Sequence, residues 1–552
     1  MTEDAHAQKR PRTLKRESSD VQVLRAASSR VTSPQAIVDG TLLPELAEQN
    51  LAGFESILQA GHPLAAGFPA NSDHMDHVEL TWGSACSGSE GVHFAIEACN
   101  LAMAKKGVPV TFTHAFSCEN NKPKQAWIND VLNAGKLFGG RDCYDPGLPG
   151  CIFCDIRDLG SDMSKCYRHS QNCPVPTVDC LFLGTSCKDL SRANSSVDRS
   201  KLVLSQEKSR GASAQTFRGM LAYCKGHRPV LVVYENVDSI DDKISTACET
   251  NLSLLMKAMK DLGYEGQKVL TDGQEFGLPC RRRRLYILFI DTKSRKVDLK
   301  SQASGQVWKT FKSLVTSCMR SPPCSKGCLL SEETHKSFVQ RALVHYQEAA
   351  AKNAQRKPAP QTWIDKHMAY ADQLGYRWAS PVSDKLKENL WYQTLTKREA
   401  DALVLSRVAD PTCEFRNLSQ SLGRINSASH AKDTGKEVAP TMMPSQQLWV
   451  ESRDRLLTGY EALIMQGFPI IPYYNKQLQT LFLSDSLDAQ GFLHDLAGNA
   501  MALPVVLAIF QSGLASVPWL VEPSAEESGE EEEQEEDGDV AIALAAVAAL
   551  KK

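Results

Sequence analysis

Between residues 78 and 291, apolar runs of strand length alternate with stretches that suit helices. The apolar runs are Val78–Trp82, Val110–Phe116, Cys180–Gly184, Val230–Tyr234 and Leu285–Ile290. The stretches that suit helices are Val92–Ala104, Pro123–Asn133, Ala212–Lys225 and Leu252–Leu262. This alternation predicts βαβ units, and therefore an α/β fold in which helices cover both faces of a parallel sheet. Because ligands bind beyond the carboxyl ends of such strands, the residues that follow each run are the functional candidates.

The composition is that of a globular protein whose charge is unevenly distributed. The 552 residues have a formal net charge of −3, yet residues 521–539 hold eleven acidic residues and no basic one. Residues 1–520 hold 60 basic and 54 acidic residues, a net charge of about +6. Seventeen cysteines without a secretory leader predict free thiols in a reducing compartment. No apolar run is long and unbroken enough to predict a membrane span.

Patterning divides the chain into a main domain, a second domain and two tails. The alternation is lost from about residue 294 to 439 and returns in part afterwards. We therefore predict a disordered basic tail at 1–35, an N-terminal extension at 36–77, the main domain at 78–293, a smaller inserted domain at 294–439, the C-terminal part of the main domain at 440–520, and a disordered acidic tail at 521–552.

Two of the predicted strands end in features that suit a nucleotide-type cofactor. Residues 83–91 read GSACSGSEG, and a helical pattern follows them. Small residues let a backbone approach a ligand, and a helix N-terminus offers free N–H groups. The second strand is followed by Glu119, whose carboxylate could accept both hydroxyls of a ribose. An ordinary surface glutamate is the alternative.

Three other features at the same predicted edge carry reactive or charged side chains. Cys187 lies in a turn where Lys188 and a nearby helix N-terminus are expected to lower the pKa of its thiol. Glu235 ends the next strand. Arg281–Arg284 lead directly into the last strand, where alternate arginines must point to opposite faces, and phosphate or base contacts would explain them.

Taken in order, these motifs resemble those of the cytosine-C5 DNA methyltransferase family. The set consists of Gly83–Gly91, Glu119, Asp155, the Cys187 turn, Glu235-Asn236-Val237, the Arg282/Arg284 pair, Gln466-Gly467-Phe468-Pro469 and Gly498-Asn499-Ala500. Each motif alone is weakly specific, whereas the ordered set is strongly so. The resemblance covers roughly residues 78–292 and 438–512. It implies a Rossmann-like S-adenosylmethionine-dependent methyltransferase sheet with a smaller inserted target-recognition domain at 294–439.

The resemblance also assigns residues to the cofactor S-adenosylmethionine. It implies that a loop contacts the methionine part, an acid holds the ribose hydroxyls, a strand end contacts the adenine, and an asparagine helps to close the pocket. In this sequence those residues are, respectively, Ala85, Cys86, Ser87, Gly88 and Gly91; Glu119; Asp155 and Ile156; and Asn499.

The same resemblance implies methyl transfer to C5 of cytosine. Cys187 would attack C6 of a flipped-out base, and Glu235 would hydrogen-bond the N3/N4 edge of the ring. Arg284, together with Arg282, would hold O2 and order the catalytic loop. The implied partner is DNA and the implied location the nucleus, with the chain acting as a monomer and without a membrane partner. Methylation of a tRNA cytosine, or a non-catalytic nucleic-acid-binding protein that keeps the fold, are the alternatives.

The sequence departs from the family pattern beside two of these motifs. Ser186 and Lys188 flank Cys187 where the family usually has Pro and Gln, so we expect the cysteine to be less rigidly placed. Cys280 replaces the usual Gln before the arginine pair.

Cysteine spacing also raises the question of a metal. Cys143, Cys151, Cys154, Cys166, His169 and Cys173 include a Cys-x-x-Cys pair, and Cys318, Cys324, Cys328 and His335 are similarly spaced. Because Cys154 directly precedes the implied adenine contact, buried thiols are the favoured interpretation, and no metal is predicted.

Overall fold

The structure is a computed structural model that covers the whole chain and describes most of it. The described residues are 30–59, 78–138, 150–194, 202–205, 211–243, 249–297, 299, 304–355, 362–378, 382–422, 437–480, 489–517 and 519, with single gaps at 109, 136 and 193. The two tails predicted at 1–35 and 521–552 therefore lie almost wholly outside the described residues.

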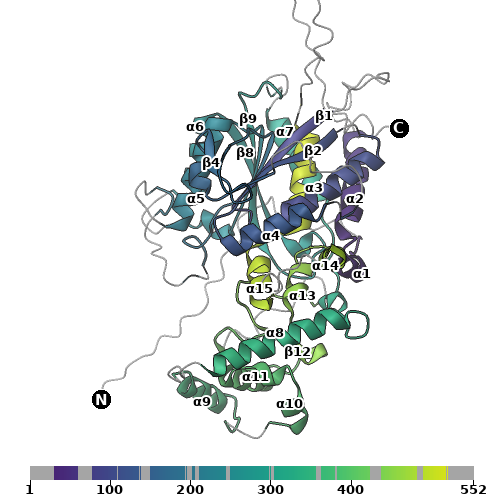
Figure 1. Ribbon diagram of the computed structural model, residues 1–552, viewed down its shortest axis with the longest axis vertical. Helices are drawn as coiled ribbons and strands as arrows, with labels where there is room; N and C mark the ends of the chain where they lie inside the picture. Colours follow the sequence, from purple (N-terminus) through teal and green to yellow (C-terminus); the bar gives the residue numbers. More distant parts are fainter. Residues whose placement is uncertain are drawn as a thin grey trace, which may run out of the picture.

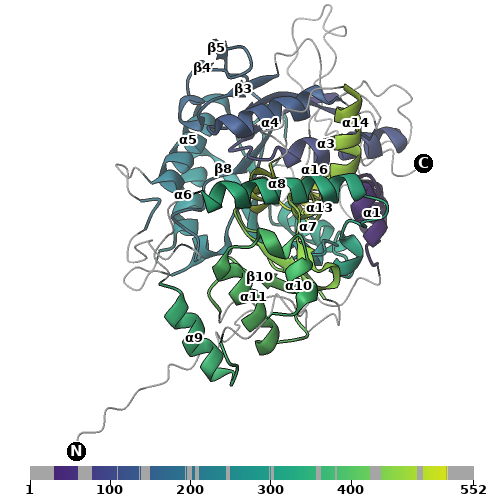
Figure 2. The same cartoon turned by 60° about the horizontal axis from the view of Figure 1, so that its bottom comes forward.

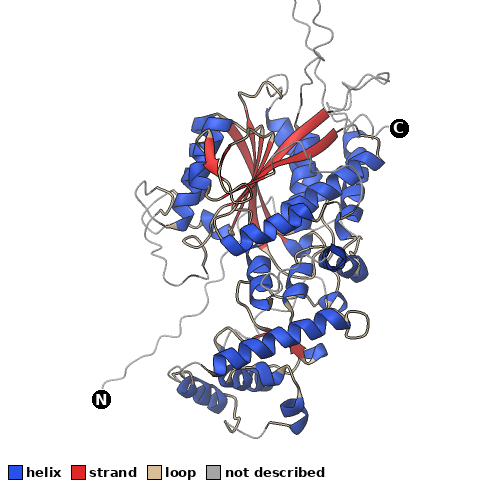
Figure 3. Ribbon diagram, in the orientation of Figure 1, coloured by secondary structure: helices blue, strands red, loops and turns tan. Residues whose placement is uncertain are grey.

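A seven-stranded sheet forms the centre of the main domain (Figures 1 and 3). Its order is β3-β2-β1-β6-β7-β9-β8. The strands are β1 (Val78–Ala85), β2 (Val110–Cys118), β3 (Cys151–Phe153), β6 (Cys180–Gly184), β7 (Leu231–Asn236), β8 (Tyr264–Asp272) and β9 (Arg283–Asp291). The first five in that order are parallel, which confirms the predicted α/β class, whereas β9 runs antiparallel to both β7 and β8. The beginning of β9 therefore lies at the edge where the parallel strands end.

Helices cover both faces of this sheet. Adjacent residues of β6 point to opposite faces, so that Phe182 joins one apolar core and Leu181 the other. The first face carries α2 (Leu42–Gln59), α3 (Gly91–Lys105), α4 (Lys122–Asn133), α7 (Ser304–Ser317) and α16 (Leu503–Ser516). The second face carries α5 (Ala212–His227) and α6 (Asn251–Leu262).

The most apolar helix is part of the core. Among the described residues, one helical stretch, 490–516, is long and apolar enough to cross a membrane, and 78% of its apolar window is buried inside the fold. It comprises α15 (Gln490–Asn499) and α16, and every residue of α16 is buried. Helix α16 packs against α2, α3 and α7, which makes it a central core helix.

The second domain lies at one end of the molecule, away from the sheet (Figures 1 and 2). It contains α8 (Lys336–Ala354), α9 (Ile364–Gln373), α10 (Asp384–Glu388), α11 (Lys397–Ala409), β10 (Phe415–Asn417), β11 (Leu448–Val450) and β12 (Arg455–Leu456). Three shorter helices lie between it and the sheet or beside the core: α1 (Pro34–Asp39), α13 (Gly459–Ile464) and α14 (Ile470–Thr480). A small hairpin of β4 (Met163–Lys165) and β5 (Asn172–Pro174) lies beside β3.

Both predicted borders of the second domain need correction. The sequence predicts a start at residue 294, but α7 packs against α2 and α16 in the main domain. It predicts an end at residue 439, yet β11 and β12 form a three-stranded antiparallel sheet with β10. We therefore place the second domain between about residue 330 and residue 456.

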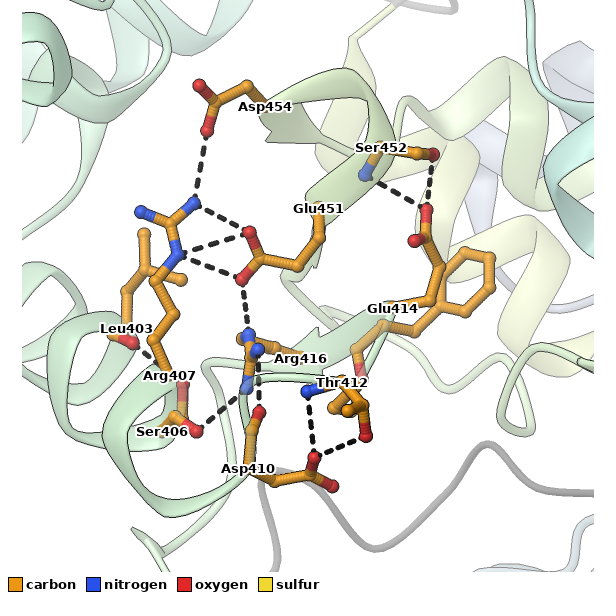
Figure 4. A network of polar contacts seen from close by, with 12 residues as sticks. Leu403, Ser406, Arg407, Asp410, Thr412, Glu414, Arg416, Glu451, Ser452 and Asp454 are labelled. Atoms are coloured by element: carbon orange, nitrogen blue, oxygen red, sulfur yellow. Dashed lines mark hydrogen bonds and ion pairs between the residues drawn. The ribbon is translucent and has the colours of Figure 1, made fainter.

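A network of ion pairs around the buried Arg416 joins the C-terminal strands of the second domain to α11 (Figure 4). Arg416 on β10 is 1% exposed and pairs with Glu451, which directly follows β11. Arg416 also donates to the carbonyls of Ser406 and Asp410 at 2.8 Å each. Arg407 of α11 reaches the same Glu451 carboxylate at 2.7 Å. These contacts join residues on both sides of the predicted border, which is why the border cannot lie at 439.

Candidate active site

Strand register brings the main candidates to one edge of the sheet. Gly184 at the end of β6 is the register partner of Glu235 on β7, and Asn236 is the partner of Leu285 on β9. Since β9 runs the opposite way, its first residues meet the ends of β6 and β7. Arg284 therefore lies beside Glu235.

Glu235 is held at this edge by a nearly buried ion pair. Its Oε1 lies 3.0 Å from Nε of Arg284, and the two side chains are 11% and 15% exposed. The neighbouring Asn236 donates to the carbonyl and hydroxyl of Thr185 at 3.2 and 3.0 Å and to the Tyr234 hydroxyl at 3.0 Å. This network fixes the turn after β6 against β7, and with it the direction of the Glu235 carboxylate.

The turn that carries Cys187 is anchored on the first turns of α5. The amide N–H of Ser186 donates to Oγ1 of Thr216 at 3.1 Å. Asp189 and Ser213 exchange two hydrogen bonds, at 3.1 and 2.9 Å. A proline at position 186 could not make the first of these bonds, since it lacks an N–H. These side-chain anchors hold the turn in place of a proline, and the expectation that Cys187 is less rigidly placed stays a prediction.

The thiol of Cys187 is protonated more readily than the sequence predicts. Burial raises its pKa, and the negative charge of Glu235 raises it further, while Arg284 and Arg282 act in the opposite direction. Lys188 is exposed and is not among these influences. The predicted lowering of the pKa is thus corrected, because desolvation outweighs the local positive charge. The charges of Glu235 and Arg284 therefore both act on the Cys187 thiol.

Three of the four consecutive arginines form ion pairs within the protein. Arg281 pairs with Asp272 at 3.3 Å, and Arg283 pairs with Asp238 at 3.1 Å, both with half-exposed guanidinium groups. Arg284 faces Glu235. The sequence prediction that these arginines contact phosphate or base stays open, because Arg281 and Arg283 keep half of their side-chain surface exposed.

Arg282 supports the site from beneath. It is 2% exposed, and both its terminal nitrogens donate to the carbonyl of Gly498, at 3.4 and 3.3 Å. Burial and the charge of Arg284 lower its pKa to about 10. Cys280, also buried, donates to the Met465 carbonyl and accepts from Gln466, both at 3.1 Å. Arg282 and Cys280 thus tie the start of β9 to the segments that carry Gly498 and Met465.

The loop after β1 has the open backbone of a ligand cradle. Cys86, Gly88 and Glu90 all have positive φ, at 55°, 56° and 52°. Glu119, at the end of β2, accepts the N–H of Gly88 at 2.9 Å through one oxygen and those of Asn120 and Asn121 through the other. Its first role is therefore to hold this loop beside β2, with some acceptor capacity left for a ligand.

The other residues that the resemblance assigns to the cofactor, outside that loop, are Asp155, Ile156 and Asn499. Asp155 caps the turn after β3. Although burial opposes its ionisation, hydrogen bonds from Arg157 lower its pKa. The next residue, Ile156, is buried. Asn499 turns its amide back onto Asp495 of its own helix, at 2.7 and 2.9 Å.

Two loop residues serve packing. Ala85 is buried in the second core. A Cβ on Gly91 would lie 2.3 Å from Leu503 and 2.9 Å from Phe468, so glycine is needed there to let α3 approach α16. Ser87, by contrast, bonds within the loop, to Ser84 at 2.6 Å and to the Cys118 carbonyl at 3.2 Å. Gly91 thus shapes the loop from behind.

Sequence reasoning missed Glu90, a fully buried acid beneath the cradle. Burial raises its pKa to about 7, although hydrogen bonds from Ser84, at 2.9 and 3.0 Å, oppose the rise. Its place directly before the helix, within a run of small residues, was the available signal. A buried carboxyl group whose pKa is raised in this way is typical of functional regions.

Glu90→Gln is expected to flatten the pH dependence of stability. The folded protein binds the Glu90 proton more tightly than the unfolded chain does, so this group's stabilising contribution is complete below about pH 4.5 and is lost as the pH rises to about 7. The lost contribution is about 3 kcal/mol. Urea unfolding at pH 5 and pH 8 should show a smaller difference in the variant. Equal differences in the two proteins would contradict the assignment.

Comparisons with known proteins identify the family to which this chain belongs. Residues 152–513, about two thirds of the chain, match the family described as C-5 cytosine-specific DNA methylase. A protein of Cryptococcus neoformans var. grubii named DNA (cytosine-5-)-methyltransferase DMT5 is 27% identical over 450 residues, and one of Verticillium dahliae with the same name is 23% identical over 483 residues. Each alignment covers 78% of this chain but only 17% and 19% of those relatives.

Solved structures that this chain matches include the S. pombe Dnmt2 methyltransferase and a Spodoptera frugiperda DNMT2 mutant. They are 13% and 11% identical, with TM-scores of 0.35 and 0.34, and the similarity covers 79% of this chain and 97% and 99% of theirs. The match to residues 152–513 includes Cys187, Glu235, Arg284 and Asn499. The chain belongs to the C-5 cytosine-specific DNA methylase family.

Proposed function

We propose that this chain transfers a methyl group from S-adenosylmethionine to C5 of cytosine in DNA through a covalent bond between Cys187 and C6. The observation that carries the proposal is the register of β6 and β7. It brings a nearly buried carboxylate, Glu235, and a nucleophile, Cys187, to the same sheet edge, with Arg284 bound to the carboxylate. Family membership supports the same reaction.

In this proposal the cofactor lies beside these residues, where the end of β6 meets the loop after β1. A Cβ on Gly184 would lie 3.0 Å from Met501, 3.8 Å from the Glu235 carboxylate and 3.9 Å from the Cys86 carbonyl. Position 184 therefore lies close to both the Glu235 carboxylate and the loop after β1, and a side chain there would crowd Met501. Residues 85–88 would line the methionine part, Glu119 the ribose, and Asp155 with Ile156 the adenine. When bound, S-adenosylmethionine supplies the methyl group as an electrophile at its sulfonium centre.

Each residue at this sheet edge would have its own part in the reaction. C5 of cytosine is a poor nucleophile, and the bond from Cys187 sulfur to C6 makes it enamine-like. Glu235 would hydrogen-bond the N3/N4 edge and share a proton there as charge builds on the ring. C5 then takes the methyl group, loses its proton, and the C6–S bond breaks to release Cys187. Arg284 would hold both Glu235 and the O2 side of the base.

The raised pKa of Cys187 bears on how this step begins. A protonated resting thiol must lose its proton when the substrate binds. A cytosine ring that hydrogen-bonds to Glu235 would remove part of the negative charge that raises the pKa of Cys187. Activation of the nucleophile is then coupled to the presence of cytosine in the site, and the base must leave the duplex to reach it.

We propose target recognition for the second domain, the nucleus as the location, and a monomeric active form. The domain's aromatic residues support groove contact only in part. Trp391 is 7% exposed and packs against Tyr346 and Arg455, so it stabilises the domain. Trp363 and Tyr376 are partly exposed and remain candidates for contact with DNA.

Glu119→Gln is expected to weaken cofactor binding about tenfold to a hundredfold. The amide cannot accept through its nitrogen, so either Gly88 or the Asn120/Asn121 pair loses its acceptor, and the ribose loses a charged one. Calorimetric titration with S-adenosylmethionine measures the change. Glu48→Gln, an exposed glutamate on α2, is the matched control. Equal affinities in all three proteins would remove Glu119 from the cofactor site.

The proposed substrate is tested by offering two nucleic acids. Labelled methyl groups from S-adenosylmethionine should be incorporated into duplex DNA by the wild-type chain, and not by Cys187→Ala. Incorporation into tRNA alone would replace DNA by RNA as the substrate. No incorporation into either would leave a non-catalytic nucleic-acid-binding protein.

A further inference from the structure

Four metal-ligating side chains meet at the edge of the sheet that β3 forms. They are Cys151 on β3, Cys166, His169, and Cys173 on β5. Their ligand atoms all lie within 4.8 Å of one another, and they form the one group of this kind among the residues that the structure describes. The three cysteines are buried and His169 is exposed. The proposed methyl transfer uses none of these side chains.

The distances within the cluster match those of a tetrahedral zinc site. Nδ1 of His169 lies 3.6 Å from Sγ of Cys151 and 3.4 Å from Sγ of both Cys166 and Cys173. In a tetrahedral site with Zn–S of about 2.3 Å and Zn–N of about 2.0–2.1 Å, nitrogen and sulfur ligands are separated by about 3.5 Å. All three sulfurs are thus placed around the same imidazole nitrogen at the spacing that a shared ion requires.

The backbone around the cluster is folded so that the donors converge. The N–H of Cys166 donates to the carbonyl of Gln171 at 2.8 Å, which closes the turn that carries His169. Ser170 in that turn has a positive φ of 56°, an uncommon conformation for a residue other than glycine. The N–H of Tyr167 donates to the Ile152 carbonyl at 2.7 Å, which holds the turn against β3.

The hairpin itself buries too little to explain this convergence. Strands β4 and β5 have three residues each, and only the central residue of each is buried. An isolated two-stranded hairpin is marginally stable in water. A cross-link between the hairpin and β3 would add to the backbone hydrogen bonds that already join them.

We propose that Cys151, Cys166, His169 and Cys173 bind one structural zinc ion. Three sulfur donors and one imidazole are a typical closed zinc set, and four protein ligands leave no position open for catalysis. The three cysteines are free of disulfide bonds, so their sulfurs are available to a metal ion. Because Cys154 donates its N–H to Lys165 of β4 at 3.0 Å and directly precedes Asp155, the ion would also fix the start of that turn.

The donor set differs from the one that spacing favours. The Cys-x-x-Cys pair of Cys151 and Cys154 draws attention in the sequence, but Cys154 is outside the cluster. The prediction of no metal depended on that pair, so it loses its basis here. Cys143 lies outside the described residues.

Metal content of the full chain tests the proposal. Protein purified without chelators and supplied with Zn²⁺ should contain one zinc per chain by plasma mass spectrometry. Cys166→Ser and Cys173→Ser should lose it, whereas Cys154→Ser, a change at the neighbouring cysteine outside the cluster, should keep it. Wild-type protein without stoichiometric zinc, or equal zinc in all variants, would overturn the site.

A second readout covers the case in which a cysteine variant does not fold. His169 is exposed, so His169→Ala should keep the wild-type circular dichroism spectrum. Loss of a direct ligand should weaken zinc affinity by roughly 10–100-fold or more in chelator competition. Co²⁺ in the wild-type chain should give thiolate charge-transfer and tetrahedral d–d bands, which His169→Ala alters. Unchanged affinity and an unchanged cobalt spectrum would contradict coordination by His169, whatever the state of the methyl-transfer activity.

Discussion

Cys187→Ala is expected to abolish methyl transfer to duplex DNA, with a fall in rate of at least about 10⁴-fold. Without the bond from sulfur to C6, C5 of cytosine has no enamine character and cannot attack the methyl donor. The thiol is partly buried and its hydrogen bond is to its own backbone, so stability and cofactor affinity should stay near wild type. Incorporation of labelled methyl groups measures the effect.

A cysteine control separates the loss of the nucleophile from general damage. Cys324→Ala removes an exposed thiol far along the chain and should retain wild-type activity. If Cys187→Ala kept more than about a tenth of the wild-type rate, the nucleophile would have to be another group.

Glu235→Gln is expected to lower the rate of methyl transfer by about 10²–10⁴-fold. The amide keeps the shape of the side chain but cannot share a proton with the ring, and it leaves Arg284 without its ionic partner in a nearly buried position. The same change removes the negative charge that raises the pKa of Cys187. We therefore expect faster alkylation of Cys187 by iodoacetamide together with slower catalysis.

Those two readouts moving in opposite directions distinguish the proposed role from simple misfolding. Asp238→Asn is a matched control, because Asp238 also pairs with an arginine of β9, at 3.1 Å, but that arginine's side chain is half-exposed. It should change the rate little, since exposed ion pairs contribute at most about 1 kcal/mol. A fall of equal size in both variants, or slower alkylation in Glu235→Gln, would contradict the assignment.

The sequence allowed prediction of those site residues whose position depends on strand ends. Parallel strands place their carboxyl ends at one edge, so Glu119, Cys187 and Glu235 could be assigned to that edge from hydrophobic pattern alone. The antiparallel direction of β9 was not predicted. It matters because it brings the beginning of that strand, and so Arg284, to the same edge.

The borders of the second domain could not be predicted, because they depend on pairing between segments that are far apart in the sequence. The strand order that joins β10 to β11 and β12 crosses an interval of about 30 residues, so a border drawn from local pattern fell inside the sheet. Helix α7 shows the same limit, because its packing on α2 and α16 is decided by tertiary contact.

Electrostatics and metal ligation were equally inaccessible from the sequence. The pKa of Cys187 depends on burial and on Glu235, neither of which local charge at Lys188 reveals. The cluster of Cys151, Cys166 and Cys173 arises from the register of a small hairpin against β3. Spacing along the chain could not select those donors over Cys154.

The central claim, that Cys187 bonds to C6 of a cytosine in DNA, is tested most directly by trapping the adduct. With fluorine in place of hydrogen at C5, the methylated intermediate cannot lose a proton and so cannot expel the cysteine. Incubation of the chain with S-adenosylmethionine and a duplex containing 5-fluorocytosine should give a complex that survives denaturation, with the cross-linked peptide joined through Cys187. A complex that forms equally well with Cys187→Ala, or attachment at another cysteine, would contradict the account.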